Sequence, residues 1–362
     1  MPTPLFQFIE DAAAEAGFER VGVAPASDPE MRELSHFADW VEAGYAGEME
    51  YLKRRNEAGE YRRSSLEAAL PWAKSVIVAA VNYNPPAPKS TEPVLPTQGW
   101  ISRYALSPAD YHETVLGALK RVESALVEKM GGTQITTRSY VDTGPVLERV
   151  YAKYAGIGWI GKNTCIINQE LGSWIFLGVI VTSLEHSTFF EAAQLAVAPD
   201  RCGTCTRCID ACPTEAIVAP MQLDASRCIA YFTIEKRGNI PEDMRSKIGR
   251  PVFGCDICQD VCPWNRKAPM TSNPEFQPDP VLVNPDLSQL ARISAQEFRE
   301  RFRASPISRA KHSGFLRNVA VAMGNSGREE YRPVLEELSG SADPIVAEHA
   351  RWAMERLKEQ TK

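Results

Sequence analysis

The amino-acid sequence predicts a mixed α/β (α+β) N-terminal domain, a short cysteine-rich insert and an α-helical C-terminal domain. Helical and strand-like patterns alternate over the first ~200 residues, as they do in mixed domains. Eight of the nine cysteines lie between Cys202 and Cys262, and only helical patterns follow them. We therefore expect domains at residues 1–198, 199–269 and 270–362, because 362 residues are long for one hydrophobic core.

The N-terminal domain is expected to combine helices with a sheet. Apolar residues recur with helical spacing in Leu5–Phe18, Glu30–Ala43 and His112–Met130. The strand-like runs are RVGVAPA, SVIVAAVNY, ITTRSYVD and SWIFLGVIVTSL, and they are apolar enough to be buried on both faces. Between them, the proline-rich segment YNPPAPKSTEPVLPTQGW is typical of a long surface loop, which in a compact domain is often functional.

A proline-rich connector, TSNPEFQPDPVLVNPDL, separates the cysteine-rich insert from the C-terminal domain. Beyond it, four segments have helical patterns: LSQLARISAQEFRERF, HSGFLRNVAVAMGNS, EEYRPVLEELSG and DPIVAEHARWAMERLKEQ. Short amphipathic helices joined by Gly, Ser, Asn and Pro turns indicate helix pairs of the HEAT-like kind.

Composition and charge limit the function classes. A net charge of −6 argues against a uniformly basic nucleic-acid-binding protein, although a local basic patch stays possible. No apolar run approaches the ~20 residues that cross a bilayer. The start, MPTPLFQFIEDAAAEAG, is acidic where a signal peptide has Lys or Arg, so we expect a cytoplasmic protein. Nine cysteines in such a protein indicate metal or redox chemistry rather than disulfides.

The first cysteine run has the spacing of a bacterial ferredoxin. It consists of Cys202, Cys205, Cys208 and Cys212, with Pro213 after them, which gives C-x2-C-x2-C-x3-C-P. In two-cluster ferredoxins the first three thiolates of such a run bind one cubane, and the fourth binds the other cluster. The run therefore predicts a ferredoxin-like insert with two [4Fe-4S] clusters.

A second, incomplete run supplies the remaining ligands. Cys255, Cys258 and Cys262 form C-x2-C-x3-C-P, and Cys228 supplies the missing thiolate. The crossing rule places cluster one on Cys202, Cys205, Cys208 and Cys262, and cluster two on Cys212, Cys228, Cys255 and Cys258. A zinc site or disulfides are the alternatives, and the three-in-a-row spacing with a following proline favours iron–sulfur clusters.

Two other features favour structural interpretations. Cys165 lies beside a buried-looking run and is more typical of a small core residue than of a ligand. Gly156, Gly158 and Gly161 spell G-x-G-x-x-G, but a helical segment precedes them and strand-like residues follow. A dinucleotide-binding fingerprint has a strand before it and a helix after it. We therefore expect a tight helix-to-strand turn, although the backbone could still approach a flat cofactor there.

Asp142 is the candidate proton donor. The clusters pass single electrons and do not themselves reduce an organic substrate, so the site that uses the electrons should lie in the N-terminal domain. Asp142 opens DTGPVLER at the end of a strand-like run, just before a helix. An Asp before Gly-Pro is often a helix N-cap, whereas a carboxylic acid beside a cofactor pocket acts as a general acid if burial raises its pKa. The residues alone leave both interpretations open.

Several motifs together resemble the epoxyqueuosine reductase family. They are DYHETV from Asp110, SYVDTGPVLER from Ser139, AGIGWIGKNT from Ala155, the two cysteine runs and FLRNVAVAMGN from Phe315. The resemblance covers nearly the whole chain. It implies reduction of epoxyqueuosine to queuosine at the wobble position of tRNA anticodons, the last step of queuosine synthesis. It also implies two [4Fe-4S] clusters and cobalamin, held in an N-terminal α/β domain related to that of reductive dehalogenases.

The resemblance assigns roles to individual residues. The family's general acid falls on Asp142, and its cluster ligands fall on the eight cysteines in the two sets given above. Its cobalamin contacts correspond to Arg62, Arg103, Lys236 and Asp256. No D-x-H-x-x-G run is present, so we do not expect a histidine to bind cobalt through that motif. We expect the scattered histidines to be structural; they are His36, His112, His186, His312 and His349.

The implied reaction removes the epoxide oxygen as water with two electrons and two protons. A low-potential electron donor, which the sequence does not identify, would feed the clusters, and these would generate low-valent cobalt. The implied partner is a tRNA with a GUN-type anticodon, whose splayed wobble base would enter a deep pocket, and no membrane partner is expected. Candidate cations for its phosphates are Arg299, Arg301, Arg303, Arg309, Lys311 and Arg317, with Arg62, Arg63, Lys236 and Arg237 elsewhere.

Two other functions stay open. A reductive dehalogenase-like corrinoid enzyme would use similar cofactors, but such proteins usually carry a twin-arginine export signal and this sequence has none. A cytosolic ferredoxin-type electron carrier would explain the clusters, but it would leave the N-terminal domain and Asp142 without a purpose.

Overall fold

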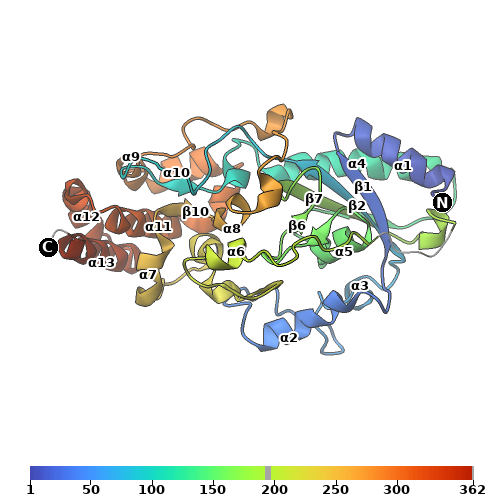
Figure 1. Cartoon of the computed structure of the whole chain (residues 1–362), viewed down its shortest axis with the longest axis horizontal. Helices are drawn as coiled ribbons and strands as arrows, with labels where there is room; N and C mark the ends of the chain where they lie inside the picture. Colours follow the sequence, from blue (N-terminus) through green and yellow to red (C-terminus); the bar gives the residue numbers. More distant parts are fainter. Residues whose placement is uncertain (192–196, 361–362) are drawn as a thin grey trace.

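The structure, a computed structural model, describes residues 1–191 and 197–360. The molecule is elongated, with the N-terminal sheet and its helices at one end and the C-terminal helices at the other (Figure 1). The cysteine-rich segment lies between these ends, where it is drawn in yellow-green to gold. No helix in the described part of the chain is both long enough and apolar enough to cross a membrane.

An antiparallel four-stranded sheet forms the centre of the N-terminal half. Its strand order is β1–β2–β7–β4. The strands are β1 (Arg20–Pro25), β2 (Ser75–Asn82), β7 (Ile175–Thr182) and β4 (Thr137–Tyr140). The central pair is in register from Ser75 opposite Thr182 to Asn82 opposite Ile175. Every residue of β2 is buried, which confirms that this apolar run is covered on both faces.

Helices cover both faces of this sheet (Figure 1). On one face α1 (Pro4–Glu15) and α4 (Tyr111–Lys129) pack against a core that includes Leu119. On the other face lies α5 (Glu148–Tyr154). The shorter elements of this half are α2 (His36–Glu42), α3 (Leu66–Ala69), β5 (Trp159–Ile160), β6 (Ile166–Ile167) and 3-10 turns at Arg32–Leu34, Arg103–Ala105 and His186–Thr188. The helices and strands expected here are confirmed, except that the segment from Glu30 divides into a 3-10 turn and α2.

The G-x-G-x-x-G segment is a tight turn between α5 and β5, as expected. Gly156 has a φ of +76°, a left-handed conformation that suits glycine. A Cβ atom on Gly158 would lie 2.3 Å from the carbonyl oxygen of Ile167, where β6 passes closely. These glycines are therefore required by the backbone of the turn itself.

The proline-rich loop after β2 carries the chain across to the C-terminal half. At its end β3 (Trp100–Ile101) pairs in parallel with β10 (Pro251–Phe253). The Tyr331 hydroxyl donates to the carbonyl oxygen of Thr97 at 3.0 Å. Ile101 and Leu106 belong to the same hydrophobic core as the C-terminal helices, so the N-terminal residues help to form that core.

Short elements make up the cysteine-rich segment. They are α6 (Arg207–Asp210), β8 (Ile217–Ala219), β9 (Gln222–Leu223), a 3-10 turn (Ala225–Arg227), a π-helix (Tyr231–Glu235), α7 (Glu242–Ile248), α8 (Ile257–Asp260) and a 3-10 turn (Pro263–Asn265). α6 and α8 pack against each other. α6 carries Cys208, the third cysteine of the first run, and α8 carries Cys258, the second cysteine of the second run. The two cysteine runs therefore face one another.

The C-terminal part is helical, as expected. Its helices are α9 (Leu287–Ala291), α10 (Ala295–Phe302), α11 (Lys311–Asn325), α12 (Arg332–Ser339) and α13 (Pro344–Gln360), with 3-10 turns at Pro274–Phe276, Pro306–Ala310 and Glu329–Tyr331. A capping box between Ser294 and Glu297 starts α10 and separates it from α9. α11 is buried from Gly314 to Gly324 and packs closely on α13, because a Cβ on Gly324 would lie 2.8 Å from Ala353.

Candidate active site

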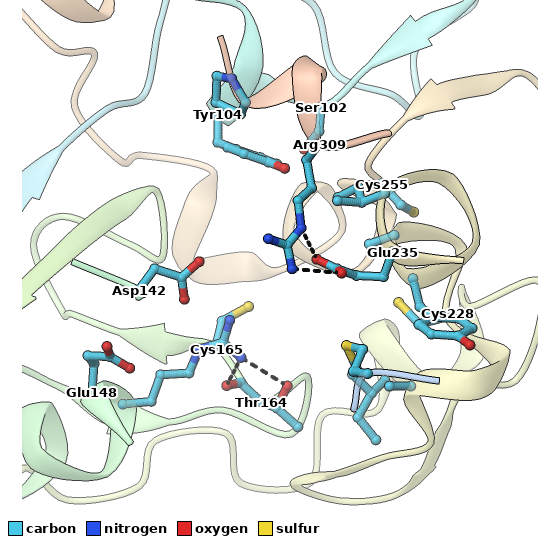
Figure 2. A pocket seen from close by; sticks show the side chains of 18 of the residues that line it. Ser102, Tyr104, Asp142, Glu148, Thr164, Cys165, Cys228, Glu235, Cys255 and Arg309 are labelled. Carbon is cyan, nitrogen blue, oxygen red and sulfur yellow. Dashed lines mark hydrogen bonds and ion pairs between the residues drawn. The ribbon is translucent and has the colours of Figure 1, made fainter. Parts of the chain in front are cut away.

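A cavity of about 1260 Å³ lies where the sheet, the cysteine-rich segment and the C-terminal part meet. Its lining comes from the start of β7, the loop after β4, the first residues of α4 and α5, the cysteine-rich segment and the turn before α11. Figure 2 shows Asp142 and Glu148 at one side of it, Cys228 and Cys255 at the other, and Cys165 between them.

Asp142 lies in this cavity with a strained backbone. It directly follows β4 and has a φ of +54°, and strain of this kind gathers at functional sites. Its side chain is 71% exposed and faces the cavity. The N-cap interpretation is wrong, because α5 begins only at Glu148 and its N-cap position is Leu147.

Two residues at the start of α4 hold the Asp142 carboxylate. The Tyr111 hydroxyl donates to Oδ2 at 3.2 Å, and His112 Nε2 lies 3.8 Å from the same oxygen. The other ring nitrogen of His112, Nδ1, lies 2.7 Å from Oδ1 of Asp110, the N-cap residue of α4. The imidazole therefore bridges two carboxylates.

This bridge decides where a proton resides. Burial alone lowers the pKa of His112, but the bonds to Asp110 and Asp142 outweigh it and raise that pKa to about 9. Although the Asp142 side chain is exposed to the cavity, the surrounding protein walls desolvate it and by themselves raise its pKa, but His112 and Arg149 outweigh this effect and lower that pKa. In the free cavity the pKa of Asp142 is therefore not raised, and His112 carries the proton near neutral pH.

Sequence reasoning missed His112, which it grouped with structural histidines. The structural interpretation holds for His349, which is fully buried between backbone groups, and for His312, whose Nε2 lies 2.7 Å from the carbonyl oxygen of Ile293. One sequence signal could have identified His112. It lies two residues after Asp110, a residue type favoured at helix N-caps, so its ring is expected in the first turn of a helix rather than in a helix interior.

A second carboxyl group faces the cavity from the first turn of α5. Burial, followed by the negative charge of Asp142, raises the pKa of Glu148 to about 7. Its Oε1 atom has no hydrogen-bond partner among the described residues. The adjacent Arg149 donates through Nη1 to the carbonyl oxygen of Thr164 at 3.0 Å (Figure 2). Asp142 and Glu148 therefore place two carboxyl groups of different pKa in the cavity, beside the fixed guanidinium of Arg149.

Cys165 is not the core residue that its sequence context predicts. Its side chain lines the cavity and is partly exposed (Figure 2). Burial, with a contribution from Asp256, raises the pKa of its thiol despite the opposing charge of Arg149. Sequence could not separate the two placements, because the residues after Cys165 are indeed a buried strand, β6.

The structure brings one of the four predicted cobalamin contacts, Arg62, to the cavity wall beside Arg63. Lys236 is not among the lining residues and forms an ion pair with Glu48. Its side chain is only 16% exposed. The ammonium group of Lys236 is therefore already matched by a carboxylate.

The other two predicted contacts, Arg103 and Asp256, lie behind the wall. The Arg103 guanidinium is buried and donates to the carbonyl oxygens of the proline-rich loop at Pro85, Ala87 and Pro88. Asp256 is 2% exposed and accepts from the Ser102 hydroxyl and from the backbone N–H of Arg103 at 2.7 Å. Burial raises its pKa to about 6. Both residues fix the backbone that presents Ser102 to the cavity.

The basic residues of the C-terminal part divide into three groups. Arg309 and Lys311 line the cavity, and Arg309 makes two 3.0 Å bonds to Glu235 (Figure 2). Arg299 and Arg303 line a separate shallow pocket on α10. Arg317 is 1% exposed and donates to backbone carbonyls of the cysteine-rich segment, and burial lowers its pKa to about 10. Its assignment to a surface patch is therefore wrong.

The thiols of the first predicted set are neighbours. Burial, with the nearby Cys202 and Cys208, raises the pKa of the Cys262 thiol to about 11. Burial, with Cys202 and then Cys205, raises the pKa of Cys208. The amino group of Lys162 donates to the carbonyl oxygens of Gly203 and Cys205, which holds the first loop in place.

The thiols of the second predicted set are also neighbours. Burial and the nearby Cys228 and Cys212 raise the pKa of Cys255 well above its usual range. Cys258 is likewise raised by burial, with Cys165, Cys255, Cys228 and Cys208 nearby. No three His, Cys, Asp or Glu side chains among the described residues lie close enough to share a single metal ion.

The two sets differ in their relation to the cavity. All four thiols of the second set line it, together with Cys165. None of Cys202, Cys205, Cys208 and Cys262 is among the lining residues. The four cysteines that line the cavity are therefore the set that the crossing rule assigns to cluster two, and the four that do not line it are the set assigned to cluster one.

Comparison with known proteins identifies the family. Residues 63–143 match the family model described as epoxyqueuosine reductase QueG, DUF1730. An epoxyqueuosine reductase of Pseudomonas aeruginosa is 39% identical, over 98% of this chain and 95% of its own length. The chain belongs to the epoxyqueuosine reductase family. It is therefore an oxidoreductase.

Other epoxyqueuosine reductases agree in sequence and structure. The relative from Xanthomonas campestris is 38% identical, over 98% of this chain and 96% of its own length. A crystal structure of epoxyqueuosine reductase with an epoxyqueuosine-modified tRNA-Tyr stem loop covers 98% of this chain and 91% of its own, with a TM-score of 0.80 and 31% identity. The structure from Streptococcus thermophilus has a TM-score of 0.81 and 29% identity, over 97% and 90% of the two chains.

The cysteine-rich segment of this epoxyqueuosine reductase has a match of its own. Residues 201–265 match a 4Fe-4S double cluster binding domain. That range contains all eight cysteines of the two predicted sets. The domain therefore supports two [4Fe-4S] clusters, which is the number that the cysteine spacing predicts.

Proposed function

We propose that this epoxyqueuosine reductase acts in the cytoplasm and reduces epoxyqueuosine to queuosine at the wobble position of tRNA. The observation that carries the proposal is that the four cluster-two thiols and Asp142 line one space of about 1260 Å³. Electrons and a proton can therefore reach one bound substrate, and such positioning is a large part of catalysis.

The proposal divides the chain by role. Residues 1–198 form the cobalamin-binding catalytic domain, and residues 199–269 form the ferredoxin-like domain. Residues 270–362 form a HEAT-like helical domain that contacts tRNA. The packing of α11 on α13 and of α12 on α13 supports the helix pairs that such a domain needs.

The side chains in the cavity fit a corrinoid. Arg62 and the unpartnered Oε1 of Glu148 would hold its polar periphery, and Arg103 and Asp256 would act through the backbone around Ser102. Both ring nitrogens of His112, the histidine in the lining, face carboxylates, so this imidazole is not free to bind cobalt. When bound, cobalamin would supply a low-valent cobalt as the reductant of the epoxide.

His112 and Asp142 would supply a proton to the leaving oxygen. Both C–O bonds of the epoxide break, two electrons form the ring alkene, and the oxygen leaves as water after taking up two protons. An alkoxide expelled into a pocket is costly, so a positioned acid accelerates such a step by ~10²–10⁴. His112 stores a proton near neutral pH, and the Asp142 carboxylate beside it can pass that proton to the oxygen.

The tRNA would approach the open side of the cavity. Arg54, Arg63 and Lys311 line it and can meet phosphates, and Arg309 lines it as an ion pair with Glu235. Arg299 and Arg303 on α10 would extend this basic surface. A splayed anticodon base could then enter between them, as RNA-modifying enzymes require. Binding should weaken strongly as salt rises.

Nucleoside analysis of cellular tRNA tests the proposal. Without this protein, tRNA should accumulate epoxyqueuosine, and a wild-type copy of the chain should restore queuosine. A copy with Asp142→Asn should not restore it. Normal queuosine levels without the protein would overturn the proposal.

A further inference from the structure

The first cysteine loop reaches the protein surface. Cys202, Cys205 and Cys208 are each partly exposed, and the residues between them, among them Gly203 and Thr206, are exposed. None of the cluster-one thiols lines the cavity, whereas all cluster-two thiols do. The helix that carries Cys208, α6, nevertheless packs against α8, which carries Cys258. Cluster one, the set proposed above, would thus lie between solvent and cluster two.

Four exposed cations flank the cluster-one cysteines in sequence. They are Arg201, Arg207, Arg266 and Lys267, which we call the basic collar. Arg201 and Arg207 are adjacent in sequence to cluster-one cysteines. Arg266 and Lys267 follow the turn that begins after Cys262. Trp264 in that turn and Cys202 both pack against the small core that contains Cys262, so both halves of the collar lie next to residues around the proposed cluster one.

The cations of the collar are unmatched within the described residues. None of the four forms an ion pair there. Two carboxylates lie next to the loop in sequence, and they accept from neutral donors: Asp200 from the N–H of Cys202 and Asp210 from the Thr206 hydroxyl. Both keep their negative charge, so the four cations of the collar leave a side-chain excess of two positive charges. This local positive charge contrasts with the net charge of −6 for the whole chain.

We propose that the basic collar is the docking surface for a small acidic protein that carries single electrons. The inference rests on the proposed function and on the two cluster sets. Each encounter moves one electron from the reduced carrier to cluster one, so the carrier is oxidised by one electron and the cluster reduced by one. Two encounters supply the two electrons of one epoxide, and no bond is made or broken at the collar.

Electrostatics selects an acidic partner at this site. Charges separated by more than the Debye length of ~8–10 Å are screened at physiological salt. The electrostatic interaction of a docked carrier with the collar would therefore be much stronger than its interaction with the negative charges elsewhere on the chain. Complementary charges of this kind raise association rates and make them fall with salt.

Stopped-flow reduction of the holoprotein tests the docking surface. Reduced plant-type ferredoxin, an acidic carrier, is mixed anaerobically with protein that holds both clusters, and cluster bleaching is followed at low salt. The variant is Arg266→Glu with Lys267→Glu, which lie outside the cysteine runs. The matched control is Lys120→Glu with Lys358→Glu, two exposed lysines on α4 and α13.

The collar variant should be reduced at least ~10-fold more slowly than wild type, with a gap that closes as salt rises, and the control should match wild type. Methyl viologen radical, a small cation, should reduce both variants at least as fast as wild type, which shows intact clusters. A direct binding measurement with oxidised ferredoxin should give the same order. Equal rates for collar variant and wild type, or an equal loss in the control, would overturn the docking proposal. No tRNA is present, so failure of epoxyqueuosine reduction would be seen separately.

Discussion

The imidazole of His112 lies 3.8 Å from the carboxylate of Asp142 and bridges it to Asp110. Because of this contact, the proton at the site is held by His112 next to Asp142, and Asp142 does not act as an isolated carboxylic acid. The carboxylate that faces the substrate space is deprotonated in the free cavity, while its neighbour is charged. Protonation of the leaving oxygen would then draw on the pair, and the two residues should respond differently to substitution.

Replacement Asp142→Asn should remove the group that delivers the proton. Turnover should fall by ~10²–10⁴, because that is the usual contribution of a positioned general acid. Iron and cobalt contents of the purified protein should stay at wild-type levels. Single-turnover conversion of an epoxyqueuosine stem loop measures the effect, and a rate equal to wild type would remove Asp142 from the mechanism.

The pKa of His112 predicts the alkaline side of the pH profile. Its raised pKa of about 9 keeps the ring protonated below that pH, so turnover should decline as pH rises through about 9. His112→Gln has no titrating ring and should lower turnover at pH 7 while losing this decline. If the variant and the wild type show the same alkaline limb, another group sets it.

The cluster assignment predicts two different cysteine outcomes. Cys228→Ala removes a proposed ligand of cluster two and should lose up to half of the bound iron, together with electron transfer to the cavity. Cys165→Ala is the matched control, because that thiol lines the same cavity but belongs to neither set. It should keep all of the iron. Iron analysis and low-temperature electron paramagnetic resonance separate these results, and equal iron loss in both variants would refute the sets.

Much of this arrangement is predictable from sequence because it depends on local spacing. The cysteine runs and the apolar strand β2 can be recognised from residues that are close together in the sequence. Asp142 could be named from its motif, but its pKa direction could not be derived, since it depends on His112 thirty residues away in sequence. The burial of Arg317 beneath carbonyls near Lys236 likewise depends on a long-range contact. The placement of Cys165 in the cavity wall could not be predicted either, because a residue beside a buried strand has the same sequence context whether it faces the core or a cavity.

A histidine far from the cavity predicts acid sensitivity of the fold. His349 is fully buried, accepts from the Ile240 N–H at Nε2, and has its pKa lowered to about 4 by burial. The folded state favours the neutral ring, so this contribution is complete above pH 6.5 and is lost as pH falls toward 4. The shift corresponds to ~3 kcal/mol of unfolding free energy over that window.

His349→Gln should be less stable than wild type at pH 7, and the difference should shrink by pH 5. Thermal unfolding of both holoproteins by circular dichroism at the two pH values measures this. A constant difference in Tm would mean that His349 does not titrate in this range.

The most direct test of the whole account is a single turnover in the absence of oxygen. Protein loaded with both clusters and cobalamin is reduced and mixed with an epoxyqueuosine-modified tRNA stem loop, and the nucleosides are identified by mass spectrometry. We predict that queuosine forms, and that it does not form when cobalamin is omitted or when Cys228→Ala protein is used. Unchanged epoxyqueuosine with fully loaded, reduced wild-type protein would contradict the account.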